Sequence, residues 1–96
     1  MPTYVVLYNF TDQGAKDIKG TVQRAAANQA DLEQRGFKMH GLYWTQGAYD
    51  LVAVIEAPDE ESMMVGLLKI GSAGNARSTT MRAYPASEMQ QIVDKM

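Results

Sequence analysis

Leu51-Val52-Ala53-Val54-Ile55 is a run of consecutive apolar residues bounded by Asp50 and Glu56. Its length and its β-branched content are typical of a strand. Because successive side chains of a strand point to opposite faces of the sheet, a run that is apolar at every position predicts burial on both faces. The 96 residues of the chain can cover only one face of a sheet with helices. We therefore expect a second copy of the chain on the other face, and so a homo-oligomer, either a dimer or a higher assembly.

The residues before this run form the other half of a predicted hairpin. Phe37 to Gln46 and Ala48 to Ala57 are both strand-like, and a single glycine separates them. The turn decides which aromatic side chains share a face, since a shift of one residue exchanges the two faces. A two-residue loop places Trp44 beside Leu51, whereas a three-residue loop places Tyr43 there. The sequence leaves this choice open.

The residues before the hairpin predict a strand and a helix. Tyr4 to Phe10 is rich in aromatic and β-branched residues, which favours a strand. An amphipathic helix then ends at Arg35, and its main part begins at Thr21. The residues expected on the buried face of this segment recur at helical spacing. They are Ile18, Val22, Ala25, Gln29 and Leu32.

The residues after the hairpin predict a helix, a strand and a short tail helix. Asp59 is the expected cap of the helix, whose buried stripe would be Met63, Met64, Leu67 and Leu68. Residues 71–75, Gly-Ser-Ala-Gly-Asn, are expected to end it, and Ala76 to Tyr84 is the fourth predicted strand. Ser87 would cap a tail helix that docks on this chain or on a neighbour through Met89, Ile92, Val93 and Met96.

The order of these elements indicates the fold class. It is β-α-β-β-α-β followed by a short C-terminal helix, which predicts an α+β, ferredoxin-like sandwich over residues 1–96 as a single domain. This architecture carries many unrelated functions, so the function has to be argued from the site.

Composition excludes several classes of site and partner. The chain has no Cys and a single His, which rules out thiol nucleophiles, iron–sulfur clusters and Cys-type zinc sites, and we expect neither a metal nor a cofactor. Nine Lys and Arg against eleven Asp and Glu, with no basic run, favour neither nucleic acid nor a membrane surface as partner. The longest apolar stretches are too short to span a bilayer, and no targeting segment is visible, so we expect a cytoplasmic protein.

Four stretches carry a family resemblance: Phe10-Thr11-Asp12-Gln13-Gly14, Gly41-Leu42-Tyr43-Trp44-Thr45-Gln46-Gly47-Ala48-Tyr49-Asp50, Glu56-Ala57-Pro58-Asp59 and Gly71-Ser72-Ala73-Gly74-Asn75. With them the chain resembles, from end to end, the GYD family of small bacterial and archaeal domains. The resemblance implies a relative of the dimeric α/β-barrel proteins and assigns no activity. More loosely, Gly47-x-Tyr49-Asp50 before an apolar strand is similar to the effector-binding domains of leucine-responsive regulators, which hold small ligands at oligomer interfaces, although DNA-binding helices are absent here.

The hairpin concentrates side chains that suit a small-molecule site. Tyr43, Trp44 and Tyr49 would hold a flat organic ligand between aromatic faces. Thr45 and Asp50 would orient that ligand by hydrogen bonds. The alternative is that cross-strand aromatic pairs hold the hairpin together and form a subunit contact.

Two polar positions complete the set of candidates. His40 would act as a general base or as a metal ligand repeated across a symmetry axis, or else is an exposed strand residue. Arg77 would bind a ligand carboxylate, or else is an edge charge of the outer strand. Asp50 also has a structural alternative, either a turn cap or a salt bridge to Arg77 or Arg82. The candidate ligand-binding residues are therefore His40, Tyr43, Trp44, Thr45, Tyr49, Asp50 and Arg77.

Three functions fit these residues. We favour a small homo-oligomeric module that binds a small molecule or acts as a regulator, with its site near the Tyr43–Asp50 hairpin and the subunit interface. The second is an interaction subunit without a ligand. The third is a cofactor-independent, oxygenase-like or isomerase-like enzyme in which His40 or Asp50 handles protons, and no Ser or Cys nucleophile motif supports it.

Overall fold

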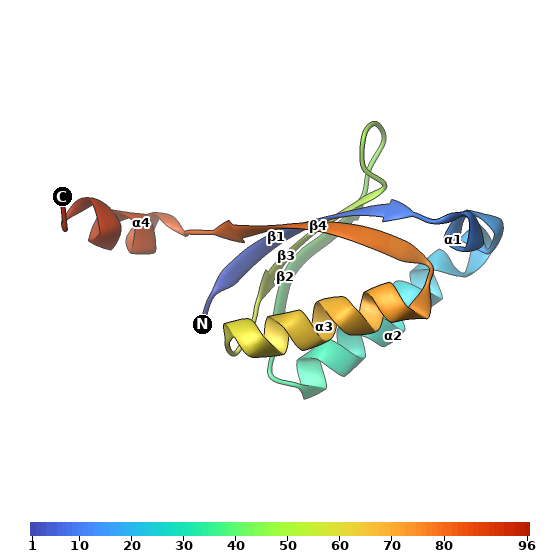
Figure 1. Ribbon diagram of the computed structural model, residues 1–96, viewed down its shortest axis with the longest axis horizontal. Helices are drawn as coiled ribbons and strands as arrows, with labels where there is room; N and C mark the ends of the chain where they lie inside the picture. The colour runs from blue at the N-terminus through green and yellow to red at the C-terminus, as the bar shows by residue number, and fades with distance from the viewer.

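The chain folds into a four-stranded antiparallel sheet with its two long helices on one face (Figure 1). The computed structural model describes all residues from Met1 to Met96. The elements follow in the order β1 (Thr3–Phe10), α1 (Asp12–Lys16), a 3-10 turn η1 (Ile18–Gly20), α2 (Thr21–Gln34), β2 (Lys38–Trp44), β3 (Leu51–Glu56), α3 (Glu60–Ala73), β4 (Ala76–Ala83) and α4 (Ala86–Val93). The strand order β2-β3-β1-β4 confirms the α+β, ferredoxin-like prediction.

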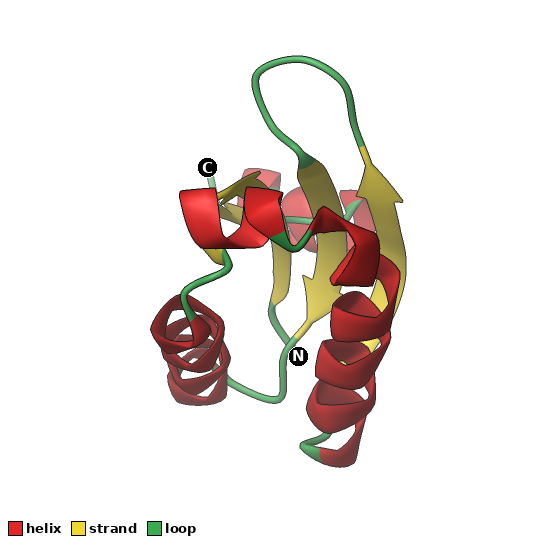
Figure 2. Ribbon diagram, turned by 90° about the vertical axis from the view of Figure 1, so that its right-hand side faces the viewer, coloured by secondary structure: helices red, strands yellow, loops and turns green.

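Side chains along the two central strands, β3 and β1, point alternately to a core face and an outer face of the sheet. The core face carries the buried side chains of Tyr4, Val6, Tyr8, Leu51, Ala53 and Ile55, which pair with one another in register. The outer face carries the half-buried side chains of Val5, Leu7, Val52 and Val54. The apolar run 51–55 therefore contributes to both faces, and α2 and α3 cover only the core face (Figure 2).

The ends of α3 agree with the sequence prediction, and the start of α4 differs from it. The Asp59 carboxylate accepts a hydrogen bond from the Ser62 N–H at 2.6 Å and caps α3, as predicted. The helix ends within residues 71–75, also as predicted: it continues to Ala73 and is capped by Gly74, which adopts the left-handed conformation with φ 86°. Ser87 does not cap α4, because the N-cap is Pro85 and the helix begins at Ala86, two residues earlier than a Ser87 cap would give.

The buried side of α3 differs from the expected stripe. Met63 and Gly66 are buried, whereas Met64 and Leu68 are 56% and 64% exposed. A Cβ atom on Gly66 would lie only 3.4 Å from the Leu32 side chain, so the glycine allows α3 to approach α2 closely. Because α3 packs through its Met63–Gly66 side, Met64 and Leu68 point away from the core.

The sheet-facing side of α2 is more polar than expected. Ile18 and Val22 are both exposed. Ile18 belongs to a 3-10 turn that interrupts the helical phase before Thr21, and Val22 is the second residue of α2. The side of α2 toward the sheet carries Thr21, Arg24, Ala25, Asn28, Gln29 and Leu32. No helix of the chain combines the length and the apolar character needed to cross a bilayer.

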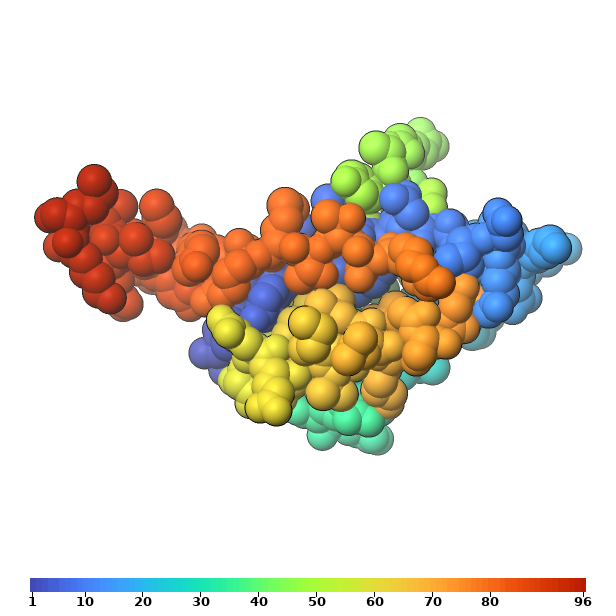
Figure 3. All heavy atoms as spheres, viewed as in Figure 1, coloured from blue at the N-terminus to red at the C-terminus, as the bar shows by residue number.

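The C-terminal helix stands away from the rest of the molecule (Figures 1 and 3). An ion pair of 3.6 Å between the Arg82 guanidinium and the Glu88 carboxylate joins α4 to β4. Its apolar side is exposed and consists of Met89, Ile92, Val93 and Met96. Within the single chain, the amphipathic tail therefore leaves its apolar side without a partner.

Candidate functional site

The predicted hairpin closes through a longer connection than either loop that the sequence suggests. Residues Thr45 to Asp50 join β2 to β3 and project beyond the sheet (Figure 2). The Thr45 N–H donates to the Asp50 carbonyl at 2.8 Å, and the Thr45 hydroxyl donates to the Tyr49 carbonyl at 2.6 Å. The Thr45 hydroxyl thus holds the turn itself.

The strand register places the hairpin aromatics on opposite faces of the sheet. Trp44 pairs with Leu51 and lies on the core face, whereas Tyr43 pairs with Val52 and lies on the outer face. Tyr43 is 65% exposed, and its ring lies against Gly41, where a Cβ atom would come within 2.9 Å of the ring. The two side chains consequently cannot hold one flat ligand between them.

Trp44 connects the hairpin to the helix layer. Its indole N–H donates to the Thr21 hydroxyl at 3.1 Å. Thr21 is the first residue of α2 and also lines the cavity described below. The contact therefore anchors the end of β2 over the beginning of α2.

Asp50 acts on the backbone of the neighbouring strand. Its carboxylate accepts a hydrogen bond from the Phe10 N–H at 2.8 Å, and its own N–H donates to the Tyr8 carbonyl at 2.8 Å. Neither expected arginine pairs with it: Arg77 donates to a carbonyl of α3, and Arg82 pairs with a glutamate of α4. Of the two structural alternatives, a turn cap or a salt bridge, the structure shows the cap, because the Asp50 side chain binds a backbone N–H.

His40 and Arg77 lie away from the hairpin connection. His40 sits at a β-bulge in β2, and its Nε2 atom is 3.1 Å from a carboxylate oxygen of Glu56, a pairing that sequence spacing did not reveal. Arg77 lies on β4, at the opposite edge of the sheet. The seven candidate residues are therefore distributed over the hairpin, the β2 edge and the β4 edge.

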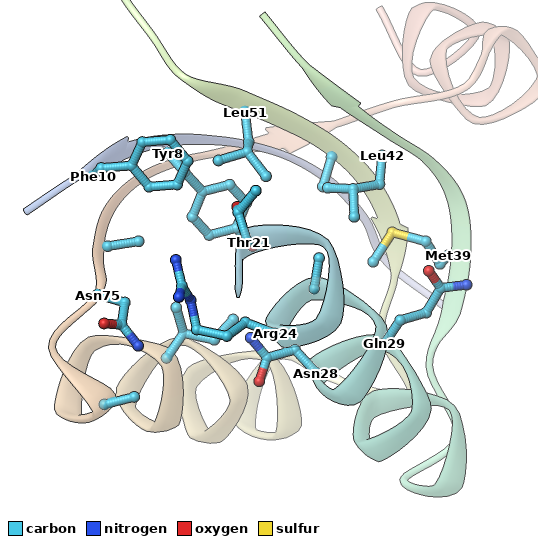
Figure 4. Close-up of a pocket in the computed structure, with 15 residues that line it drawn as sticks. Tyr8, Phe10, Thr21, Arg24, Asn28, Gln29, Met39, Leu42, Leu51 and Asn75 are labelled. Carbon is cyan, nitrogen blue, oxygen red and sulfur yellow. The ribbon is translucent and has the colours of Figure 1, made fainter. Parts of the chain in front are cut away.

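A half-open cavity of about 100 Å³ lies between the core face of the sheet and the helices (Figure 4). The sheet side contributes Tyr8, Phe10, Met39, Leu42, Leu51, Ala53 and Ala76. The helix side contributes Thr21, Arg24, Ala25, Asn28 and Gln29 from α2, and Ile70 and Ala73 from α3, with Asn75 beside them. None of the seven candidate residues lines this cavity.

Sequence reasoning missed the cavity, although one signal pointed to it. Arg24 and Asn28 are four residues apart and lie on the same side of α2 as the buried Leu32. Polar side chains at core-facing positions of an amphipathic helix are unusual, because burying them costs free energy unless they are paired. The four-residue spacing of Arg24 and Asn28 was the signal in the sequence that this side of α2 does not face a fully packed core.

Comparison with known proteins agrees with the motifs quoted from the sequence. The model of the GYD domain family matches residues 4–93. The chain belongs to the GYD domain family. A relative of this GYD protein in Thermus thermophilus, named "Glutamine synthetase and cystathionine beta-lyase binding protein", is 31% identical over 90 residues, which cover 93% of this chain and 95% of the relative. Together the two comparisons support a small binding or interaction module.

Proposed function

We propose that this GYD protein is a homo-oligomeric binding module in which two copies pair through the outer faces of their sheets. The observation that carries the proposal is the apolar surface that no helix covers. The residues of this surface pair with one another across neighbouring strands. They are Val5, Leu7, Val52, Val54, Tyr43 and Met81. Tyr43 is 65% exposed and Met81 is 47% exposed. A contiguous apolar patch of this kind is typical of an interaction site.

The size of this surface favours a second copy that also contacts α4. Four strands about 4.8 Å apart and about 20 Å long give a face of roughly 400 Å². A stable interface usually buries about 800 Å² on each partner. The sheet face alone would supply about half of that area. The exposed apolar side of α4, which extends beyond the sheet, offers a further contact surface (Figure 3).

The oligomeric state tests this pairing directly. Val54→Lys places a charge in the middle of the outer face, and we expect it to yield a folded monomer in sedimentation velocity. Val22→Lys is the matched control, because Val22 is exposed on α2, and this variant should assemble like the wild type. A wild-type protein that is monomeric at micromolar concentration, or a Val54→Lys variant that still assembles, would contradict the proposal.

The name of the Thermus relative supports a second part of the proposal, which is that the module binds another protein. That relative is named for binding glutamine synthetase and cystathionine β-lyase. In this chain the Thr45–Asp50 connection projects from the sheet and offers an exposed contact element. We expect these two enzymes, purified, to bind the immobilised protein in biolayer interferometry. Ala48→Arg should weaken the binding, while Ala30→Arg on the exposed side of α2 should not. If neither enzyme binds, this part fails and the pairing of copies is unaffected.

The predicted ligand-binding residues near the hairpin remain a proposal, and a ligand site there depends on the pairing of two copies. Pairing through the outer faces would bring Tyr43 to the subunit interface, close to the hairpin connection. Native mass spectrometry of the purified protein tests it, since a retained molecule adds mass to a whole multiple of the chain. A bare oligomer would leave the interaction subunit as the better description. The enzyme alternative gains no support, because neither His40 nor Asp50 lines the cavity.

A further inference from the structure

We propose that the cavity between the sheet and α2 binds a small organic carboxylate with an apolar body, held at its polar end by the Tyr8 hydroxyl and the Arg24 guanidinium. The cavity lies on the core face, opposite the surface proposed for pairing, so this inference does not rest on the oligomeric state. Three observations carry it: the size and lining of the cavity, a Tyr8 hydroxyl without a partner in the chain, and a lining whose one charged residue is the arginine Arg24.

The cavity has the size and lining of a site for a small apolar group. Its volume is about 100 Å³, and 10 of its 15 lining residues are hydrophobic. An engineered apolar cavity of about 150 Å³ in another protein binds benzene, so a closed cavity of about 100 Å³ would hold only part of such a molecule. Because the cavity is open on one side, a ring or a short aliphatic chain can enter while its polar end stays at the opening. The space exists because small side chains line it, namely Ala25, Ala53, Ala73 and Ala76.

The Tyr8 hydroxyl supplies a donor with no partner in the chain. Tyr8 is only 8% exposed, and its hydroxyl makes no hydrogen bond to another residue. No fully inaccessible polar side-chain atom of the chain lacks a partner, so the Tyr8 oxygen must reach accessible space, and the cavity that Tyr8 lines provides it. Burial raises the pKa of Tyr8 to about 12, which keeps the hydroxyl protonated and able to donate.

Arg24 supplies the positive charge. In Figure 4 its side chain extends from α2 toward the end of the cavity where Tyr8 and Asn75 lie. One guanidinium nitrogen donates to the Asp17 carbonyl at 2.7 Å and to the Asp17 carboxylate at 3.0 Å, while the other makes only a 3.5 Å contact to the Gly14 carbonyl. The Asp17 side chain is 76% exposed, so the pair is weak and does not use the full donor capacity of the guanidinium.

The charges of the lining select the class of ligand. Arg24 is the one charged residue among the 15, and no Asp or Glu lines the cavity. A ligand carboxylate would accept hydrogen bonds from both Arg24 and Tyr8, and hydrogen bonds between charged groups are stronger than neutral ones. A ligand amine would lack an anionic partner in the lining, and a neutral alcohol would gain no ionic hydrogen bond from the guanidinium. An apolar body with one carboxylate therefore matches the cavity best.

Titration with three probes of similar size tests the proposal: benzoate, benzyl alcohol and benzylamine. Binding is followed by amide shifts in NMR spectra of the full-length protein. We expect benzoate to bind about tenfold more tightly than benzyl alcohol, with benzylamine weakest. The shifts should map to α2 and to the Tyr8 region of β1. Equal affinity for the three probes, or no binding of benzoate at millimolar concentration, would overturn the proposal.

Variants separate the cavity from the surface. Ala25→Leu fills the cavity and should abolish benzoate binding, whereas Ala26→Leu, the adjacent exposed alanine of α2, should leave it unchanged. Arg24→Gln should remove the preference for benzoate over benzyl alcohol. Tyr8→Phe, which preserves the packing of the ring, should weaken benzoate binding severalfold and provides the test if Ala25→Leu fails to fold. Benzoate binding that Ala25→Leu leaves intact in a folded protein, or that Tyr8→Phe leaves at wild-type strength, would contradict the assignment.

Discussion

The Asp50 carboxylate accepts a hydrogen bond from the backbone N–H of Phe10 at 2.8 Å, although the two residues are 40 positions apart in the sequence. The contact joins Asp50, the residue before β3, to Phe10, the last residue of β1, and lies beyond the last ladder pair of these two strands, Tyr8 with Leu51. An aspartate side chain thus replaces the backbone acceptor that a longer β3 would have supplied. It also fixes the point at which the hairpin connection leaves the sheet.

Removing this acceptor should destabilise the protein. We expect Asp50→Ala to lower the free energy of unfolding by about 1–3 kcal/mol, because the Phe10 N–H is left part-buried without a partner. Asp50→Asn keeps an acceptor oxygen and should cost less. The measurement is urea unfolding followed by circular dichroism, with Asp12→Ala as an exposed control. An Asp50→Ala variant as stable as the control would show that water satisfies the Phe10 N–H.

Two glycines near the end of α3 should respond to alanine in opposite directions. Gly71 is helical and a Cβ atom there meets nothing within 4 Å, so Gly71→Ala should raise the free energy of unfolding by about 0.5–1 kcal/mol. Gly74 has φ 86° and a Cβ atom would lie 3.3 Å from the Gln13 side chain, so Gly74→Ala should lower it by about 1 kcal/mol or more. Thermal unfolding of the two variants checks both signs. A gain at position 74 would contradict the left-handed cap.

The features that the sequence predicted well depend on local pattern. The apolar run at 51–55 predicted β3 and its two apolar faces, and the position of Asp59 predicted a cap that the structure confirms. Both have their signal within a few consecutive residues of the sequence. Strand order also followed, because the βαββαβ order restricts the topology.

The features that could not be predicted depend on contacts between distant elements. The faces of Tyr43 and Trp44 follow from a connection that Asp50 holds through Phe10, a residue far away in the sequence. The outward turn of Met64 follows from the close approach that Gly66 permits between α3 and α2. Neither relationship can be inferred from one segment alone, because each depends on a partner residue in another element.

Asp59 should make part of the stability of the protein dependent on pH. Hydrogen bonds from Ser62, first from its backbone N–H and then from its side chain, hold the pKa of Asp59 below the ordinary value. A carboxyl group whose pKa is lower in the folded state stabilises the fold above its unfolded pKa, and this stabilisation is lost as the pH falls through the folded pKa.

We therefore expect Asp59→Asn to lower the urea midpoint at neutral pH and to differ less from the wild type at about pH 3 and below. Urea unfolding at both pH values measures the difference. Asp94→Asn serves as the control, because Asp94 lies on the exposed tail. A difference of the same size at both pH values would mean that the negative charge of Asp59 does not contribute to the cap.

The exposed side of α4 should matter for assembly and not for the folding of a single chain. Met89 and Ile92 are 47% and 41% exposed, so their own chain gives them few contacts to lose. We expect Met89→Glu combined with Ile92→Lys to raise the dissociation constant of the oligomer by about tenfold or more, because each change brings a charge into an apolar contact. Sedimentation velocity over a concentration series measures this constant, and Ser87→Lys on the same helix is the control. If the double variant assembles as tightly as the wild type, α4 makes no contact with a second copy. If it instead lowers the unfolding midpoint of the monomer, α4 packs on its own chain in solution.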